Sequence, residues 1–315
     1  MRIIVMGSGG TGGYFGAKLA RAGEDVTFVA RGEHLRAIQT KGLSVTSATE
    51  GSWTVKAPAV ERLDGHPPAD LVLFCVKSFD TESAAQTLLP VVGPDTGVLS
   101  IQNGVDNEEK LERIMGPGHV LGGVALVFAT IAGPGVIEHF LLGKIQFGEM
   151  DGRDSPRVRA FLAACERAAI PCELSRDVAR TLWQKYVFLV AQSGMSALTR
   201  CPAGAFRAVP ETRRLYRLLL EEMAALAQAA GVDLGPDIVD VNMRNLDALG
   251  ANAYSSLHHD LTHGKRLELE ALQGHAVDLG ARYAVPTPTL FAVYAALKPY
   301  IAGPPQALLS NREDR

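Results

Sequence analysis

Several features that would place a chain in a special class are missing or rare here. The 315 residues include two tryptophans and 6% aromatic residues, and the net charge is only -3. This weak charge gives no electrostatic reason to expect a nucleic acid or an anionic membrane as a partner. No apolar run approaches the ~20 residues that span a bilayer, and the N-terminus has no signal-peptide pattern. We therefore expect neither a membrane nor a nucleic-acid partner.

Cysteine is also scarce, which argues against a disulfide framework. The four cysteines form no C-x-x-C pair and have no disulfide-rich spacing: Cys75, Cys165, Cys172 and Cys201. We expect buried thiols in a reducing cytoplasm. One group of residues resembles a metal-ligand spacing: His258, His259, Asp260 and His263. It precedes a helix end at Gly264 without a further ligand cluster, so we interpret it as cap and surface residues and expect no metal.

The order of the segments predicts two domains. Hydrophobic residues make up 47% of the chain, and its length suffices for two sizeable cores. Short apolar runs alternate with helical patterns up to about Ser175, and only helical patterns follow. We predict an α/β fold, with an N-terminal Rossmann-type dinucleotide-binding domain at 1–175 and an all-helical domain at 176–302. We expect a cleft between them and a loose tail at 303–315.

The first thirty residues carry the strongest motif. An apolar run, Arg2 to Met6, predicts a strand buried on both faces, a helix follows from Tyr14 to Ala22, and Asp25 to Ala30 predicts a second strand. Between the first strand and the helix lies a G-x-G-x-x-G motif, which we assign to cofactor binding: Gly7, Ser8, Gly9, Gly10, Thr11 and Gly12. This order indicates a βαβ unit that binds a pyrophosphate at a helix N-terminus.

Each glycine of the motif has an expected purpose. Gly7 makes the tight turn, Gly9 lets a pyrophosphate approach the backbone, and Gly12 lets the helix pack close to the sheet. The alternative is a glycine-rich turn in another kind of α/β protein. The motif follows a strand and opens a helix close to the N-terminus, which favours dinucleotide binding.

The end of the second strand indicates the choice of cofactor. NAD sites usually carry Asp or Glu there to bind the ribose 2′-OH, but this chain has Arg31. An arginine can pair with a 2′-phosphate, so we predict NADPH. The alternative is a solvated Arg31 with Glu33 as the ribose ligand, although Glu33 lies past the strand end.

Two further polar residues follow predicted strands. Lys77 comes after the buried strand 69–76, and Asn103 after the strand 97–101. Ligands of open α/β sheets bind beyond the carboxyl ends of strands, so both residues are candidates for cofactor or substrate contacts. The alternatives are a lysine facing water and an asparagine serving a turn.

The remaining pattern predicts further elements. Strands are expected at 122–130, 133–139 and 145–148, joined by a proline-glycine turn, and within 43–58 as a hairpin or an edge. Helices are expected at 34–41, 81–92, 155–169, 177–199, 210–230, 236–249, 255–262, 266–282 and 287–301.

Two charged residues stand on apolar parts of the helical half. Lys185 lies in LWQKYVFLVA, which predicts a largely buried helix, and burial would lower the pKa of a lysine enough to make it a proton donor. Glu268 shares a predicted helix face with Ala271, Leu272, His275 and Leu279. We interpret Lys185 and Glu268 as facing one cleft. The alternative is a structural ion pair joining two helices.

The motifs together resemble those of the ketopantoate reductases (2-dehydropantoate 2-reductases). The resemblance extends from Met1 to about Ile301 and rests on GSGGTGGYFG, VTFVARG, DLVLFCVKS, SIQNGVDN, ATIAGPGVIEH, WQKYVFLVAQSGMSALT, SSLHHDL and GKRLELEALQG. It implies a Rossmann domain followed by a helical domain. It also implies NADPH-dependent reduction of 2-dehydropantoate to (R)-pantoate, a step of pantothenate and coenzyme A biosynthesis.

The resemblance assigns roles residue by residue. Lys185 matches the general acid, which also contacts the substrate. Glu268 matches a catalytic acid that anchors the substrate, and it is a candidate cofactor-binding residue as well. Asn103 matches a residue at substrate and cofactor, and Ser256 a substrate residue. Lys77 matches a lysine beside the cofactor and Arg31 the arginine at the 2′-phosphate. From the residues alone, Ser255 and Ser256 are expected simply to cap a helix.

The chain departs from the family pattern at two positions. Four and eight residues after the catalytic lysine, family members carry substrate-binding asparagines, where this chain has Leu189 and Ser193. Ser193 remains a candidate substrate residue, but the identity of the 2-oxo acid becomes open. The alternatives are a reductase of a less polar 2-oxo or 3-oxo acid and a non-catalytic NADP(H) sensor. A homodimer is possible on sequence grounds.

Overall fold

A computed structural model describes residues 1–305, so most of the expected tail at 303–315 lies outside the described residues. The chain divides into two compact units, Met1–Leu182 and Trp183–Arg315. The division falls within helix α6 (Val178–Thr199), seven residues after the domain limit expected from the sequence.

The first three elements form the predicted βαβ unit. They are β1 (Arg2–Met6), α1 (Gly10–Arg21) and β2 (Asp25–Val29). Side chains of β1 alternate between two hydrophobic cores, so this strand is buried on both faces as expected. Helix α1 begins four residues before its predicted start, because the glycine-rich segment itself forms the first turn.

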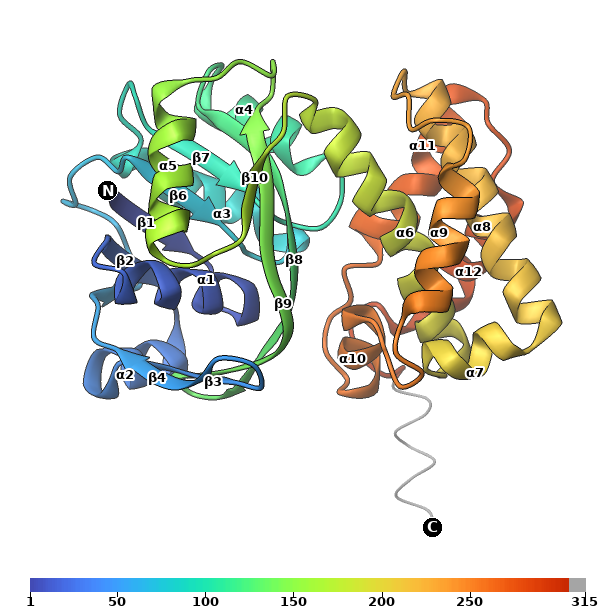
Figure 1. Ribbon diagram of the computed structural model, residues 1–315, viewed down its shortest axis with the longest axis horizontal. Coiled ribbons are helices and arrows are strands. Elements are labelled where there is room, and N and C mark those ends of the chain that lie inside the picture. Colours follow the sequence, from blue (N-terminus) through green and yellow to red (C-terminus); the bar gives the residue numbers. More distant parts are fainter. Residues whose placement is uncertain (306–315) are drawn as a thin grey trace, which may run out of the picture. The chain divides into compact units, whose positions relative to one another are not determined.

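The first unit is built on one ten-stranded sheet (Figure 1). Its order is β4-β3-β9-β8-β7-β6-β1-β2-β5, with β10 paired to β9. The strands after the βαβ unit are β3 (Leu43–Ser47), β4 (Gly51–Val55), β5 (Ala59–Val60), β6 (Leu71–Phe74), β7 (Gly97–Ser100), β8 (Val120–Gly133), β9 (Val136–Glu149) and β10 (Cys172–Leu174). From β5 to β8 all neighbours are parallel, and the order reverses between β1 and β6. This is the Rossmann arrangement, whose ligand site lies where the order reverses.

Helices cover both faces of this sheet. Helices α1 and α5 (Pro156–Arg167) share a core with Ile3 and Val5 of β1. Helices α3 (Thr81–Leu88) and α4 (Asn107–Met115) share a second core with Ile4 and Met6. Helix α2 (Gly32–Lys41) follows β2. Helix α4 was not predicted, because NEEKLERIM has few apolar residues.

A long hairpin replaces three of the predicted strands. Strands β8 and β9 are antiparallel, with 14 residues each, and the expected proline-glycine turn joins them. The register shifts at three places along the pair, which interrupts the simple alternation of buried and exposed side chains. The sequence pattern therefore suggested separate short strands. Strands β3 and β4 form the expected hairpin at one edge of the sheet.

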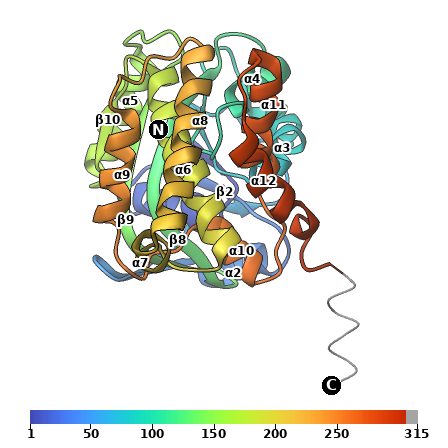
Figure 2. The same ribbon diagram turned by 90° about the vertical axis from the view of Figure 1, so that its right-hand side faces the viewer.

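The described part of the second unit is helical (Figure 2). Its elements after α6 are α7 (Ala203–Ala208), α8 (Pro210–Ala229), α9 (Ile238–Ala248), α10 (Ser256–Thr262), η3 (Glu270–Gly274), α11 (His275–Tyr283), α12 (Pro288–Leu297) and η4 (Lys298–Tyr300). Helix α8 packs against α7, α9, α11 and α12. The short helix α7 was not predicted. No helix among residues 1–305 has the length and apolar character needed to cross a membrane.

The helix expected at 266–282 has a different start. Residues 265–268 are not helical, η3 is a π-helix, and a regular α-helix begins only at His275. In η3, the Gly274 amide donates to the Leu269 carbonyl five residues earlier, at 2.9 Å. Glu268 therefore stands just before a widened turn, and the expectation that it lies on a helix face is wrong.

Candidate functional site

The glycine motif forms a tight turn between β1 and α1. Gly7 has a φ of 94°, a conformation that favours glycine. A Cβ on Gly12 would lie 2.2 Å from the Gly7 carbonyl oxygen, so only glycine lets α1 approach β1 this closely. Ser8 is buried, and its hydroxyl donates to the Val29 carbonyl at 2.9 Å, which ties the loop to β2.

Gly9 differs from its neighbours in what surrounds it. A Cβ built there would meet no protein atom within 4 Å, and its φ of -75° is open to any residue. The protein itself therefore gives no reason for glycine at this position. Open space above a loop that leads into a helix N-terminus is what a pyrophosphate requires, so the loop fits a dinucleotide.

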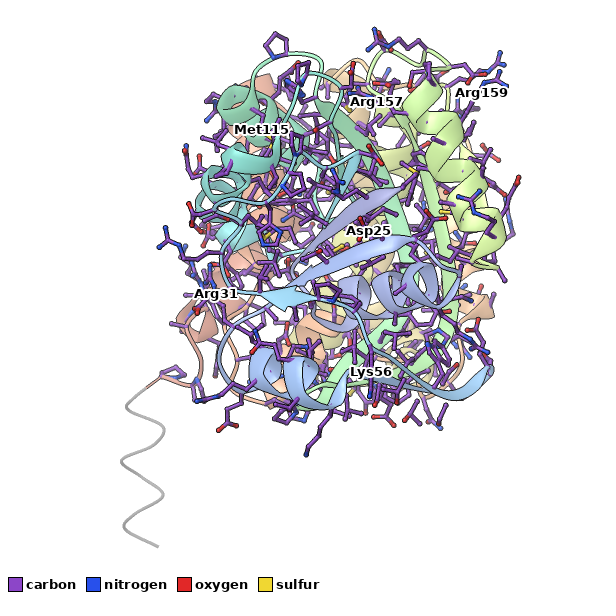
Figure 3. The ribbon with its side chains drawn as sticks, turned by 90° about the vertical axis from the view of Figure 1, so that its left-hand side faces the viewer. Asp25, Arg31, Lys56, Met115, Arg157 and Arg159 are labelled. Carbon is purple, nitrogen blue, oxygen red and sulfur yellow. The ribbon has the colours of Figure 1, made fainter. Side chains whose placement is uncertain are left out.

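Arg31, Lys77 and Asn103 follow the carboxyl ends of β2, β6 and β7. Strands β2 and β6 are the neighbours of β1, and β7 lies beyond β6. Figure 3 shows Arg31 at the far end of β2 from Asp25. Both Arg31 and Lys77 are exposed, whereas Asn103 is half-buried. The sheet thus brings all three residues and the glycine loop to one edge, where ligands of this fold bind.

A buried polar network lies beneath Asn103. Gln102 donates through Nε2 to the Val76 carbonyl at 2.9 Å and to the Thr81 hydroxyl at 2.8 Å. The Thr81 hydroxyl lies 3.1 Å from Oδ1 of Asn107, whose Nδ2 donates to the Asn103 carbonyl at 2.9 Å. The network was not predicted from the sequence, because its members look like turn and cap residues. It fixes the backbone on either side of the β6 and β7 ends.

Glu108 is a second feature that sequence reasoning missed. It is a buried carboxyl in the first turn of α4. Burial raises its pKa to about 7, and the nearby charge of Asp106 adds to the increase. Such a group titrates near neutral pH beside the carboxyl end of β7.

In the second unit, Lys185 and Glu268 interact electrostatically. Lys185 is half-buried on α6, and Glu268 is 6% exposed. Burial lowers the pKa of Lys185 from 10.5 to about 8, while the negative charge of Glu268 acts in the opposite direction. Lys185 can therefore release and regain a proton close to neutral pH, as a general acid must.

Models of one protein family match both halves of the chain. The family model described as ketopantoate reductase PanE/ApbA matches residues 3–152, and its C-terminal counterpart matches residues 177–301. The chain belongs to the ketopantoate reductase family. It is an oxidoreductase of this family.

Individual relatives match nearly the whole chain. A 2-dehydropantoate 2-reductase of Mesorhizobium japonicum is 31% identical over 95% of this chain and 97% of the relative. A ketopantoate reductase structure from Ralstonia eutropha is 33% identical, with a TM-score of 0.88 over 95% of this chain and 98% of that one. A D-mandelate dehydrogenase with NADH and anilino(oxo)acetate shares the fold at 20% identity and a TM-score of 0.87, with 95% and 98% coverage.

Leu189 and Ser193, the two positions where the resemblance predicts a departure from the family pattern, lie on α6 beyond Lys185. Leu189 is half-buried, while Ser193 is fully buried and accepts a hydrogen bond from Nε2 of Gln273 at 2.9 Å. One turn further, the Ser196 hydroxyl accepts from the Ser255 amide at 3.3 Å. Both serine hydroxyls therefore have partners within the helical unit. The role of Ser193 as a substrate residue remains a prediction.

Ser255 and Ser256 begin helix α10. Ser255 caps it, because its hydroxyl accepts from the His258 amide at 3.0 Å, whereas Ser256 is exposed in the first turn. Ser256 is thus free of the capping role expected from the residues alone. His259 and His263 stack on each other, and residues 1–305 contain no group of three or more His, Cys, Asp or Glu suited to a metal.

Proposed function

We propose that this ketopantoate reductase family member reduces a 2-oxo acid with NADPH, and that 2-dehydropantoate, giving (R)-pantoate, is its first candidate substrate. The observation that carries the proposal is Lys185, whose pKa of about 8 and buried acidic neighbour suit a proton donor. The reduction takes place in the cytoplasm, which the free state of all four cysteines supports.

Each candidate residue has a separate role in the proposed reaction. The nicotinamide supplies the hydride that adds to the carbonyl carbon of the substrate. Lys185, as the ammonium ion, donates a proton to the oxygen on which negative charge develops, and Glu268 stabilises that ammonium ion. Asn103 and Ser256 hold the substrate, and Lys77 contacts the cofactor.

The glycine loop and Arg31 bind the cofactor in this proposal. The loop amides and the N-terminus of α1 hold the pyrophosphate, and the open space at Gly9 supports that placement. The exposed guanidinium of Arg31 pairs with the 2′-phosphate, which makes the enzyme prefer NADPH to NADH.

A second candidate is reduction of a less polar 2-oxo or 3-oxo acid. Leu189 supports it, because an aliphatic side chain offers no hydrogen bond to a hydroxyl of the substrate. The Ser193 hydroxyl already accepts from Gln273 and donates to the Val190 carbonyl at 3.5 Å, so it is less available to a polar substrate.

A panel of 2-oxo and 3-oxo acids, assayed with NADPH and NADH side by side, tests the proposal. We expect 2-dehydropantoate to give the highest kcat/KM and NADPH to be preferred. A higher kcat/KM for an acid with an apolar side chain would establish the second candidate. NADPH binding without oxidation of NADPH by any acid would instead indicate a sensor.

Arg31→Ala provides the control for the cofactor assignment. This variant should lose most of the preference for NADPH while its kcat/KM with NADH stays unchanged. Equal use of both cofactors by the unaltered enzyme would contradict the role of Arg31.

A further inference from the structure

The segment that carries Glu268 is tied to the helix that carries Lys185 by three buried hydrogen bonds. Tyr186 donates through its hydroxyl to the Leu272 carbonyl at 2.7 Å. Gln273 donates through Nε2 to the Val190 carbonyl at 2.8 Å and to the Ser193 hydroxyl at 2.9 Å. All of these bonds lie within the helical unit.

These hydrogen bonds are made by residues that lie close to Lys185 and Glu268 in the chain. Tyr186 directly follows Lys185 on α6, and Leu272 lies one turn after Glu268, whose carbonyl accepts from the Leu272 amide at 3.2 Å. The bonds therefore hold the two backbone segments from which Lys185 and Glu268 project.

Gln273 is built into this arrangement. Its side chain is 0% exposed, and a Cβ on Gly194 of α6 would lie 3.2 Å from its Nε2 atom. Glycine at position 194 thus leaves room for the amide. A buried amide that bonds to a main-chain carbonyl of another helix gives a fixed geometry, since any shift would break a desolvated hydrogen bond.

We propose that Gln273 and Tyr186 are positioning residues that hold Glu268 at a set distance from the amine of Lys185. Neither residue needs to touch the substrate. The proposal rests on the proposed function, in which Lys185 donates the proton. The proposal also gives a role to the hydrogen bond between Gln273 and Ser193: the Ser193 hydroxyl helps to hold the Gln273 side chain against α6.

The pKa of Lys185 depends on its distance from Glu268. Burial and the charge of Glu268 act on its pKa in opposite directions, so the balance depends on the separation of the two segments. Glu268 is the ionisable group that acts on the amine, and His275 lies near Tyr186, with ring centroids 6.5 Å apart. A displacement of about 1 Å can cost orders of magnitude in rate when a proton donor must meet its acceptor.

Two conservative variants with matched controls test the proposal. Tyr186→Phe removes one bond and keeps the ring, whereas Gln273→Met removes two and keeps the volume. Tyr216→Phe is the control for the first, because the Tyr216 hydroxyl is buried without a hydrogen-bond partner. Gln228→Met, at an exposed position on α8, is the control for the second.

Two readouts separate positioning from simple stability. The first is kcat and the KM for NADPH. The second is the pH at which an amine-selective acylating reagent labels half of Lys185. The folded protein is labelled at each pH and then digested, and mass spectrometry measures the labelled fraction. Labelling requires no turnover, so it still tests the positioning if the enzyme reduces none of the 2-oxo acids and the proposed function fails.

We expect Tyr186→Phe and Gln273→Met to lower kcat by roughly tenfold or more, with less than about a twofold change in the KM for NADPH. The labelling midpoint of Lys185 should shift in both variants and stay unchanged in the controls. An unchanged midpoint in both variants, even with a lower Tm, would overturn the proposal. Equal shifts in the controls would do so as well.

Discussion

The amine of Lys185 loses its proton far more easily than an exposed lysine does. Burial lowers its pKa from 10.5 to about 8, because the ammonium ion is deprived of water, and Glu268 limits the decrease. The sequence predicted this residue from its apolar helix, although the side chain is half-buried rather than fully enclosed. No sequence pattern could show the pKa of Glu108, because its burial depends on contacts between distant segments.

This pKa predicts how the rate of reduction depends on pH. The protonated amine is the active form, so kcat should be constant below about pH 7 and fall tenfold per unit above about pH 8. Steady-state assays at saturating NADPH measure this. Glu268→Gln removes the charge that favours the ammonium ion, so the decline should begin at a lower pH.

Lys185→Ala is the reference for that experiment. It should lower kcat by about 100-fold or more and abolish the alkaline decline, while NADPH still binds. A pH profile that is the same in Lys185→Ala and the unaltered enzyme would remove Lys185 from the mechanism.

At the scale of single elements, the glycine turn between β1 and α1 was predictable because its constraints are local. A tight turn and a close helix need glycine whatever the rest of the chain does. The π-helix η3 was not predictable, because it forms where Gln273 bonds to Val190 and Ser193, some 80 residues away in the chain. Helix α4 was missed for a similar reason: its few apolar residues gain their core only from the folded sheet.

Two alanine variants should separate ligand binding from packing in the glycine turn. Gly9→Ala meets no protein atom, so its Tm should equal that of the unaltered protein while the Kd for NADPH rises by about tenfold or more. Gly12→Ala places a Cβ 2.2 Å from the Gly7 carbonyl oxygen, so it should lower the Tm and weaken binding together. Thermal unfolding and fluorescence titration measure the two effects. A Gly9→Ala protein that binds NADPH normally would contradict the proposed pyrophosphate site.

For the whole molecule, the sequence predicted the class of each half because strand and helix periodicities change near residue 175. It could not predict the edge strands β5 and β10, which have two and three residues and exist only through pairing with β2 and β9. It also could not show what fixes α5 to the end of β9. That link is Glu149, buried at 3% exposure and bonded to Arg157 at 2.6 Å and 2.7 Å and to Ser155 at 2.5 Å.

Glu149→Gln should destabilise the protein by about 1–3 kcal/mol, because it leaves the half-buried guanidinium of Arg157 without its charge partner. Burial alone would raise the pKa of Glu149, but the bonds from Arg157 and Ser155 outweigh burial and lower it. The stabilisation by this ion pair is therefore complete above pH 4.5, the ordinary pKa of a glutamate. It is lost as the pH falls through the lower pKa that Glu149 has in the folded protein. Urea unfolding at several pH values measures both effects.

The exposed pair of Asp154 and Arg159 supplies the comparison for this measurement. Asp154→Asn should cost less than about 1 kcal/mol, since water and side-chain freedom offset such a contact. A similar loss of stability in both variants would show that burial of Glu149 adds nothing.

The widened turn at η3 holds one residue more than an ordinary helical turn would. Deleting a single residue there, such as Ala271, would allow the chain to wind as a regular helix up to α11. Each residue of an α-helix advances the direction of its side chain by about 100°, so the carboxylate at 268 would swing away from α6. A single-codon insertion or deletion in this turn would thus bring Glu268 next to the Lys185 amine or remove it from there, with both residues unchanged.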